Sequence, residues 1–199
     1  MPGKLIVFEG IDGAGTETQS KMLLSHFKSG KVPAERICYP DYSSEIGKLI
    51  KQFLQKKMEL SPEMQFVLYA GDMVKDKERI RAWLGQGKTV IADRYFNSTI
   101  AYQGVRGFDF KKALRFADDF GIPRPDVVIF LKISPEESAR RKLGENGRLD
   151  RHEEDIRFLE RVNQSYYKMA MDNVFGRWFI IDGGQSKEKV FREVLNVLK

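Results

Sequence analysis

Short apolar runs alternate along the chain with longer segments in which apolar residues recur every three or four positions. The short runs cover residues 5–9, 36–39, 89–93, 127–133 and 178–182, and several of them are apolar throughout. Continuous apolarity is typical of strands that are buried on both faces, whereas the longer segments have the period of amphipathic helices. The alternation predicts an α/β fold with a central five-stranded parallel sheet flanked by helices. Such sheets bind ligands at the carboxyl ends of their strands.

Four helices have a recognisable start. Ser61 and Ser134 each precede a Pro-Glu pair, which places a capping hydroxyl before a proline in the first turn. Asp109 and Ser186 are candidate caps for two further helices. After Ser61 the apolar spacing predicts one long helix that continues to Gly85.

Size and composition indicate a folded domain. The chain has 199 residues, of which 42% are hydrophobic and 31% are charged, so we expect a single domain over residues 1–199. Cys38 is the only cysteine, and with two histidines the chain lacks the ligands of a Cys/His zinc site. No apolar run reaches the roughly 18 residues of a membrane span, and the N-terminus lacks a signal-peptide core. We therefore expect a cytoplasmic protein without membrane contact.

The net charge of +6 favours partners that carry phosphate. Basic residues are mixed with acids throughout, and no helical pattern has a basic stripe with interleaved aromatic residues. This distribution disfavours a nucleic acid polymer as the partner and leaves small phosphate-bearing molecules.

A glycine-rich segment follows the first apolar run and precedes a helical pattern. Gly10, Gly13 and Gly15 keep the scaffold of the phosphate-binding pattern G-x-x-x-x-G-K-[ST], in which backbone N–H groups converge on phosphate oxygens. Thr16 stands at the position of the lysine, and Glu17 at that of the magnesium-binding hydroxyl. The pattern alone is therefore weak, and an ordinary turn from strand to helix fits it equally well.

Further motifs strengthen the phosphate-loop interpretation. Residues 10–19 resemble the opening of thymidylate kinases, G-x-D-G-A-G-K-T-T-Q, apart from the central pair. Residues 39–47, 68–72 and 93–104 resemble the family's F-P-x-R-x-S-x-I-G, L-F-A-A-D-R and D-R-Y-x-x-S-x-x-A-Y-Q-G motifs. Residues 125–153 resemble its fourth strand and the D-R-x-E of its lid. Because the motifs have the family's order and spacing, the chain is identified as a member of the thymidylate kinase family.

This resemblance implies a fold, a reaction and an assembly. The fold would be the three-layer fold of P-loop nucleoside monophosphate kinases, with a lid at about residues 140–152. The reaction would be phosphoryl transfer from ATP to dTMP, giving dTDP and ADP in dTTP biosynthesis, with Mg²⁺ as cofactor. The family also implies a homodimer in which the helices after the phosphate loop and the third strand pack across a two-fold axis.

The resemblance also implies three sets of site residues. The ATP-binding residues would be Gly10, Ile11, Asp12, Gly13, Ala14, Gly15, Thr16, Glu17, Thr18 and Arg140. The dTMP-binding residues would be Asp12, Tyr42, Tyr69, Met73, Arg94, Ser98, Tyr102 and Gln103. The catalytic residues would be Asp12, Asp93, Arg94 and Arg148, and the metal ligands would be Asp93 and Glu17.

Individual roles follow from the family motifs. Arg94, after the third predicted strand, would bind the acceptor phosphate, and Tyr69 would stack on the thymine ring. A surface ion pair for Arg94 and a core position for Tyr69 are the structural alternatives. In the lid, Arg148 is the first candidate for the arginine that stabilises the transition state, and Arg141 is the second. Arg151 would hold the lid through neighbouring acids.

The chain departs from the family pattern on the acceptor side as well as in the phosphate loop. Met73 and Tyr42 stand where the family carries arginines. Each lost cation weakens phosphate binding, since a hydrogen bond to a charged group contributes roughly 1.5–3 kcal/mol. Lys77, one helical turn beyond Met73, and Lys21, after the phosphate loop, are candidate replacements. Glu17 is a candidate for binding Mg²⁺ through water.

These departures leave two alternatives to an ATP-dependent dTMP kinase. The first is a kinase with an altered donor or acceptor nucleotide, because the acceptor motifs are better preserved than the donor motif. The second is a catalytically weak nucleotide-binding or regulatory protein on the same fold. Nucleotide binding without turnover would favour the second.

Overall fold

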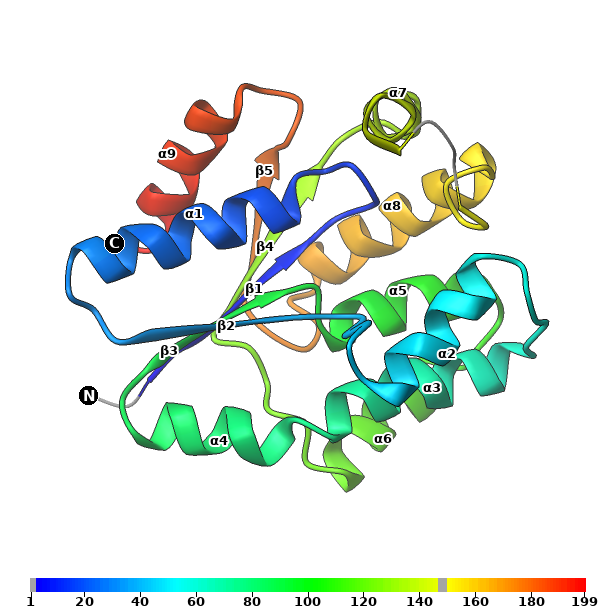
Figure 1. The fold of residues 1–199 in the computed structure, drawn as a ribbon, viewed down its shortest axis with the longest axis horizontal. Helices are drawn as coiled ribbons and strands as arrows, with labels where there is room; N and C mark the ends of the chain where they lie inside the picture. Colours follow the sequence, from blue (N-terminus) through cyan, green and yellow to red (C-terminus); the bar gives the residue numbers. More distant parts are fainter. Residues whose placement is uncertain (1–2, 147–149) are drawn as a thin grey trace.

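The computed structural model describes residues 3–146 and 150–199 of the chain. Within these residues, five parallel strands form one sheet in the order β2-β3-β1-β4-β5 (Figure 1). The predicted α/β fold with a central five-stranded parallel sheet is therefore confirmed. The strands are β1 (Leu5–Glu9), β2 (Ala34–Cys38), β3 (Thr89–Asp93), β4 (Val127–Lys132) and β5 (Trp178–Asp182).

Helices cover both faces of this sheet (Figure 1). The helices of the described residues are α1 (Thr16–Ser29), α2 (Glu45–Leu54), α3 (Pro62–Val74), α4 (Lys77–Gly85), α5 (Phe96–Val105), α6 (Phe110–Asp119), α7 (Pro135–Asn146), α8 (Ile156–Met171) and α9 (Lys187–Val197). On one face α1 and α9 pack together against the sheet. On the other face α4 packs against β3 and α8 against β4 and β5, and α5 lies between α3 and α8.

The centre of the sheet is apolar because helices cover it on both sides. Every residue of β1 is buried, as are the inner residues of β4, which explains their continuous apolarity. The edge strand β2 is half-buried along most of its length and carries two adjacent charged residues, Glu35 and Arg36. Phe8 of β1 is in register with Asp93 of β3 and Ile129 of β4. The carboxyl ends of the central strands therefore meet at one edge of the sheet.

The prediction of one long helix after Ser61 is wrong, because the structure has two helices there. α3 ends at Val74 and α4 begins at Lys77, with Asp76 between them. The carboxylate of Asp76 is buried, accepts a hydrogen bond from the Tyr39 hydroxyl, and lies at the N-terminus of α4. The side chain makes no hydrogen bond to the backbone of α4, but its negative charge is favoured at a helix N-terminus, where it also pairs with Arg79. The apolar spacing continues through the break and does not reveal it.

The helix starts predicted from the sequence are confirmed. Each capping oxygen accepts a hydrogen bond from the backbone N–H three residues further on, at Ser61, Asp109, Ser134 and Ser186. Two predicted strands shift slightly: β2 begins at Ala34 and ends at Cys38, and β4 ends at Lys132. Among the residues described, no helix is both long enough and apolar enough to cross a membrane.

Gly47 fixes α2 against the loop that follows β2. A β-carbon at this position would lie 1.9 Å from the carbonyl oxygen of Asp41. We expect Gly47→Ala to lower the free energy of unfolding by about 1–3 kcal/mol, because the backbone must move to relieve the clash. Urea titration followed by circular dichroism measures this change.

The control for this variant is Gly85→Ala at the end of α4, where a β-carbon would have no neighbour within 4 Å. This substitution should be neutral or stabilise the protein, since alanine favours a helix over glycine by roughly 1 kcal/mol. Equal losses of stability in the two variants would contradict the packing described for α2.

Candidate active site

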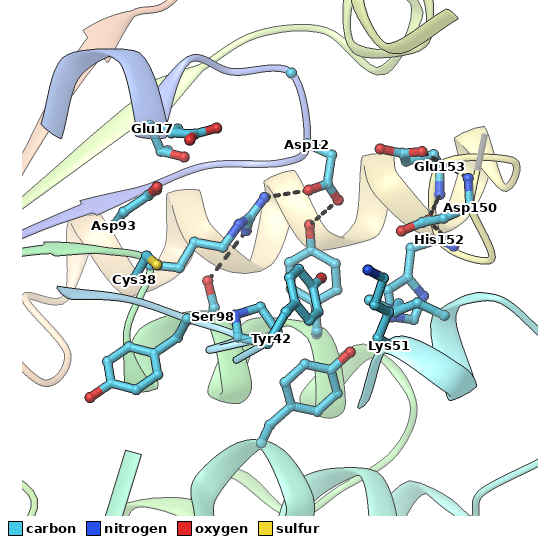
Figure 2. A pocket seen from close by; sticks show the side chains of 18 of the residues that line it. Asp12, Glu17, Cys38, Tyr42, Lys51, Asp93, Ser98, Asp150, His152 and Glu153 are labelled. Atoms are coloured by element: carbon cyan, nitrogen blue, oxygen red, sulfur yellow. Dashed lines mark hydrogen bonds and ion pairs between the residues drawn. The ribbon is translucent and has the colours of Figure 1, made fainter. Parts of the chain in front are cut away.

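A cleft of about 900 Å³ opens at the carboxyl ends of β1, β2 and β3 (Figure 2). Its volume is in the range of small-molecule sites. Gly10, Ile11 and Ala14 form the buried part of the predicted phosphate loop. Arg140 does not line the cleft, and Arg148 lies outside the described residues. The predicted site residues that line it are Asp12, Gly13, Gly15, Thr16, Glu17, Thr18, Tyr42, Tyr69, Met73, Asp93, Arg94, Ser98, Tyr102 and Gln103.

The phosphate loop turns sharply between β1 and α1. Gly13 and Gly15 have φ angles of 74° and 93°, which side chains rarely permit. A β-carbon on Gly10 would lie 2.8 Å from the carbonyl oxygen of Leu131. Gly15 caps α1, so the unpaired backbone N–H groups of the first helical turn border the cleft. The glycines therefore build a helix N-terminus that is suited to an anion.

Thr16 and Asp93 meet where the loop enters α1. Thr16 is 8% exposed, and its hydroxyl lies beside the carboxylate of Asp93, where it favours the charged form. Arg36 of β2 donates from Nη2 to Oδ2 of Asp93 over 2.7 Å. Burial raises the pKa of Asp93, although Thr16, Arg94 and Arg36 offset part of this effect. Arg36 is absent from the site predicted from the sequence.

Arg94 lies at the junction between the loop and β3. Its backbone has a φ angle of 61°, and its side chain is 14% exposed. Nη1 donates to the carbonyl oxygen of Gly10 over 2.7 Å, and Nη2 donates to Oδ1 of Asp12 over 2.8 Å. Burial opposes ionisation of Asp12, but Arg94, His152, Lys142 and the Tyr102 hydroxyl together outweigh it and lower the pKa of this carboxyl. The ion pair joins the loop to the end of β3.

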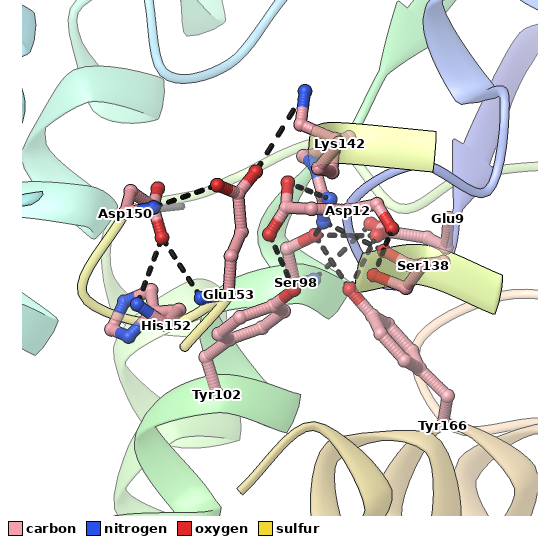
Figure 3. A network of polar contacts seen from close by, with 12 residues as sticks. Glu9, Asp12, Ser98, Tyr102, Ser138, Lys142, Asp150, His152, Glu153 and Tyr166 are labelled. Carbon is pink, nitrogen blue, oxygen red and sulfur yellow. Dashed lines mark hydrogen bonds and ion pairs between the residues drawn. The ribbon is translucent and has the colours of Figure 1, made fainter. Parts of the chain in front are cut away.

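Glu9 is a fully buried carboxylate that lies beside Asp12 in Figure 3 and close to the charge of Arg94. It accepts hydrogen bonds from the backbone N–H groups of Tyr95 and Ser98, over 2.9 and 3.1 Å. The hydroxyls of Ser98 and Tyr166 also donate to it. Burial raises the pKa of Glu9 to about 7. Glu9 is absent from the site predicted from the sequence, although an acid at the end of an apolar strand is the available signal.

The opposite wall of the cleft comes from α3 and α5. Tyr69 and Tyr102 line it, together with Gln103 and Thr99. The buried Oε1 of Gln103 and Oγ1 of Thr99 have no hydrogen-bond partner among the described residues. Buried polar atoms are normally paired, so these two atoms suit a bound ligand. Thr99 is missing from the predicted set, although it lies within the 93–104 motif.

The phosphate loop and the aromatic wall together indicate a nucleotide site, and comparison with known proteins decides the family. A family model described as thymidylate kinase matches residues 8–194. The chain belongs to the thymidylate kinase family. Thymidylate kinase from Homo sapiens is 32% identical over 192 residues, which are 96% of this chain and 88% of the human protein. Thymidylate kinase from Carboxydothermus hydrogenoformans is 33% identical over 206 residues, covering 100% of this chain and 98% of that protein.

A solved structure gives the same result for the fold. The thymidylate kinase of Candida albicans, whose structure is described as revealing the origin of broad substrate specificity, superposes with a TM-score of 0.78. It is 26% identical in sequence, and the superposition covers 99% of this chain and 91% of that one. The predicted thymidylate kinase family, P-loop kinase fold and enzyme class of nucleoside monophosphate kinase are confirmed.

Two lysines expected near the phosphates lie elsewhere in this family member. Lys77 donates to the carbonyl oxygen of Phe120 over 2.8 Å and does not line the cleft. It therefore does not occupy the place of the arginine that Met73 replaces. Lys21 pairs with Glu17 over 2.6 Å on the exposed surface of α1.

The helical part of the predicted lid, α7, contacts the phosphate loop. Arg141 donates from Nη1 to the carbonyl oxygen of Gly13 over 3.0 Å. Arg140 instead pairs with Glu137 over 2.7 Å on the exposed face of α7. Arg140 does not line the cleft, so no contact supports its predicted role in ATP binding.

Arg151 anchors the other end of the lid. It pairs with Glu59 over 2.7 Å and donates from Nε to the carbonyl oxygen of Phe53 over 3.0 Å. The acid that it binds is thus distant in sequence, whereas neighbouring acids were expected. The contacts tie the lid to the end of α2 and the segment after it.

Glu9 gives the stability of the chain a pH dependence. Its pKa is raised from 4.5 to about 7, so the folded state binds the proton more tightly than the unfolded state. The contribution of Glu9 to stability is then highest below about pH 4.5 and falls as the pH rises to about 7. Glu9→Gln removes the ionising group and should not show this fall.

Urea titrations of both proteins at pH 5 and pH 8 measure the effect. We expect the stability of the natural chain to fall relative to that of Glu9→Gln, by up to about 3 kcal/mol. A difference that is the same at both pH values would contradict the environment described for Glu9.

Proposed function

We propose that this chain is an ATP-dependent dTMP kinase, a transferase that gives dTDP and ADP in dTTP synthesis. The observation that carries the proposal is one cleft that joins an anion-binding helix N-terminus to a wall of aromatic and unpaired polar side chains. Arg94 lies between these two parts. Donor and acceptor nucleotides therefore have adjoining places, as direct phosphoryl transfer requires.

The donor phosphates bind at the start of α1. Backbone N–H groups from Thr16 to Thr18 donate to phosphate oxygens, and the helix dipole adds a favourable field. Arg141 supports the loop from α7 through the carbonyl oxygen of Gly13. Because these donors belong to the backbone, the change from lysine to threonine at position 16 leaves them in place.

Arg94 binds the acceptor phosphate and holds it in line with the donor. Phosphoryl transfer depends on positioning and on neutralising charge more than on proton transfer. The contacts with Gly10 and Asp12 fix two guanidinium nitrogens, so Arg94 offers its remaining hydrogens in a set direction. We assign the transition-state contact to Arg148, since Arg141 is engaged by loop carbonyl groups.

The acceptor base lies against α3 and α5. Tyr69 stacks on the thymine ring, as the family motif implies. The Oε1 atom of Gln103 is a hydrogen-bond acceptor and matches the N–H group of thymine. Tyr102, whose hydroxyl donates to Asp12 over 3.3 Å, borders the place of the sugar.

Mg²⁺ fits the acids on the donor side. Kinases hold this ion through one or two carboxylates together with phosphate oxygens and water. Asp93 and Glu17 both line the cleft beside the start of α1 (Figure 2). They would hold the ion there, and it would supply charge neutralisation to the donor phosphates.

The assembly is a homodimer, as the family resemblance implies. α5 is covered by α3 and α8 within the chain, so it is poorly placed for the expected two-fold contact. Met64 and Val67 of α3 are 48% and 51% exposed and are better candidates for the interface. A mass of two chains in light scattering supports this assignment, and a mass of one chain contradicts it.

Product analysis tests the proposed reaction. The purified chain is mixed with dTMP, ATP and Mg²⁺, and dTDP is detected by chromatography. The same mixture with dUMP, dCMP, dGMP or another nucleoside triphosphate establishes specificity. We expect dTDP to form fastest from dTMP and ATP. Faster turnover of another pair would indicate an altered kinase, and dTMP binding without any product would indicate a regulatory protein.

The metal dependence of the rate distinguishes the two acids. We expect Asp93→Asn to raise the Mg²⁺ concentration for half-maximal activity by about ten-fold or more, and Glu17→Gln to raise it less. Glu17 is exposed and shared with Lys21, so its contact with the ion is weaker. Glu45→Gln, on the exposed start of α2, is the control. An unchanged Mg²⁺ titration for Asp93→Asn would exclude Asp93 as a ligand.

A further inference from the structure

Arg36 places a guanidinium group beside the phosphate loop. It extends from the edge strand β2, lines the cleft, and has a side chain that is only 15% exposed. Nη2 donates to Oδ2 of Asp93 over 2.7 Å, and Nε donates to the hydroxyl of Ser20 over 2.8 Å. Ser20 in turn donates to the carbonyl oxygen of Glu17 over 2.9 Å. Arg36 thus binds both the end of β3 and the start of α1.

These contacts bring positive charge to the place where the loop lacks it. Arg36 donates to the Asp93 carboxylate, and the Thr16 hydroxyl favours the charged form of the same carboxylate. A single carboxylate therefore separates the guanidinium from the side chain at position 16. Among the other cations that line the cleft, Arg94 is bound to Asp12, and Lys142 lies 3.7 Å from Glu153 in the lid segment. Three lysines line it from the end of α2 and the residues directly after this helix: Lys51, Lys56 and Lys57. Of these, Lys51 lies over the ring of Tyr42 and Lys56 pairs with Glu154. Lys21, which follows the loop, pairs with Glu17 on the surface.

Arg36 also retains hydrogen-bonding capacity. A guanidinium has five N–H donors, and the contacts with Asp93 and Ser20 use two of them. The others have no hydrogen-bond partner among the described residues. Arginine remains charged at any physiological pH and binds phosphate oxygens in a planar, forked geometry.

We propose that Arg36 replaces the phosphate-loop lysine as the cation that stabilises the phosphates of the donor nucleotide. It positions Asp93 beside the start of α1 and offsets the negative charge of the bound triphosphate. The inference rests on the proposed function for the presence of a donor nucleotide, but not on the identity of the acceptor. Loss of Arg36 should therefore weaken donor binding and leave dTMP binding intact.

Calorimetric titration with Mg-ATP and, separately, with dTMP tests the proposal. We expect Arg36→Met to raise the Kd for Mg-ATP by at least about ten-fold, as the loss of a charged hydrogen bond implies. Its Kd for dTMP should stay within about two-fold of that of the natural chain, and Arg36→Lys should recover part of the loss. The matched control is Lys88→Met, which removes a different ion pair of β2, the one between Lys88 and Glu35 over 2.8 Å.

A second substitution makes the test specific. If Arg36 takes the place of the lysine, adding Thr16→Lys to Arg36→Met should restore Mg-ATP binding. An unchanged Kd for Mg-ATP in Arg36→Met would overturn the proposal, as would equal losses of ATP and dTMP binding or a loss matched by Lys88→Met. A folded double variant without recovery would also overturn it.

These binding measurements separate the two levels of inference. If the natural chain binds Mg-ATP but makes no dTDP, the proposed function fails while the role of Arg36 is still measured. If dTDP forms and Arg36→Met binds Mg-ATP normally, the proposed function stands and the role of Arg36 fails.

Discussion

The rest of the site depends on the contacts that hold the largely buried guanidinium of Arg94 in the wall of the cleft. Arg94 is 14% exposed, and taking an ion out of water costs several kcal/mol unless protein partners replace the solvent. Asp12 and the carbonyl group of Gly10 are those partners, and both belong to the loop after β1. The requirement to neutralise Arg94 therefore fixes the loop against the end of β3. This contact therefore sets the spacing between the phosphate loop and the wall of the cleft formed by α3 and α5.

The backbone around Arg94 is held by a second buried charge. A φ angle of 61° is unfavourable for arginine by roughly 1–3 kcal/mol and persists only where neighbouring contacts enforce it. Glu9 enforces it by accepting hydrogen bonds from the backbone of Tyr95 and Ser98 at the start of α5. The same carboxylate thus sets the path of the chain after β3 and the direction of α5. Function and fold share these contacts, which explains why a polar cluster lies within an apolar core.

Sequence periodicity predicted the sheet because burial on both faces leaves a clear apolar pattern, and β1, β3 and β5 have the expected bounds. It missed the break between α3 and α4, where the buried Asp76 contacts Tyr39, a residue distant in sequence. The motifs predicted about half of the residues that line the cleft. Arg36 was missed because an arginine on an edge strand normally faces solvent. Only the folded chain brings it to Asp93, 57 positions away.

A single ligand that carries both nucleotides tests most directly whether donor and acceptor share one cleft with Arg94 between them. A suitable compound is adenosine joined to thymidine through five phosphates, and calorimetry gives its affinity and stoichiometry. We predict one molecule per chain and a Kd at least about ten-fold below that of ATP, because linking the two halves reduces the entropic cost of binding the second. Arg94→Met should abolish this gain. A Kd no lower than that of ATP would contradict a shared cleft.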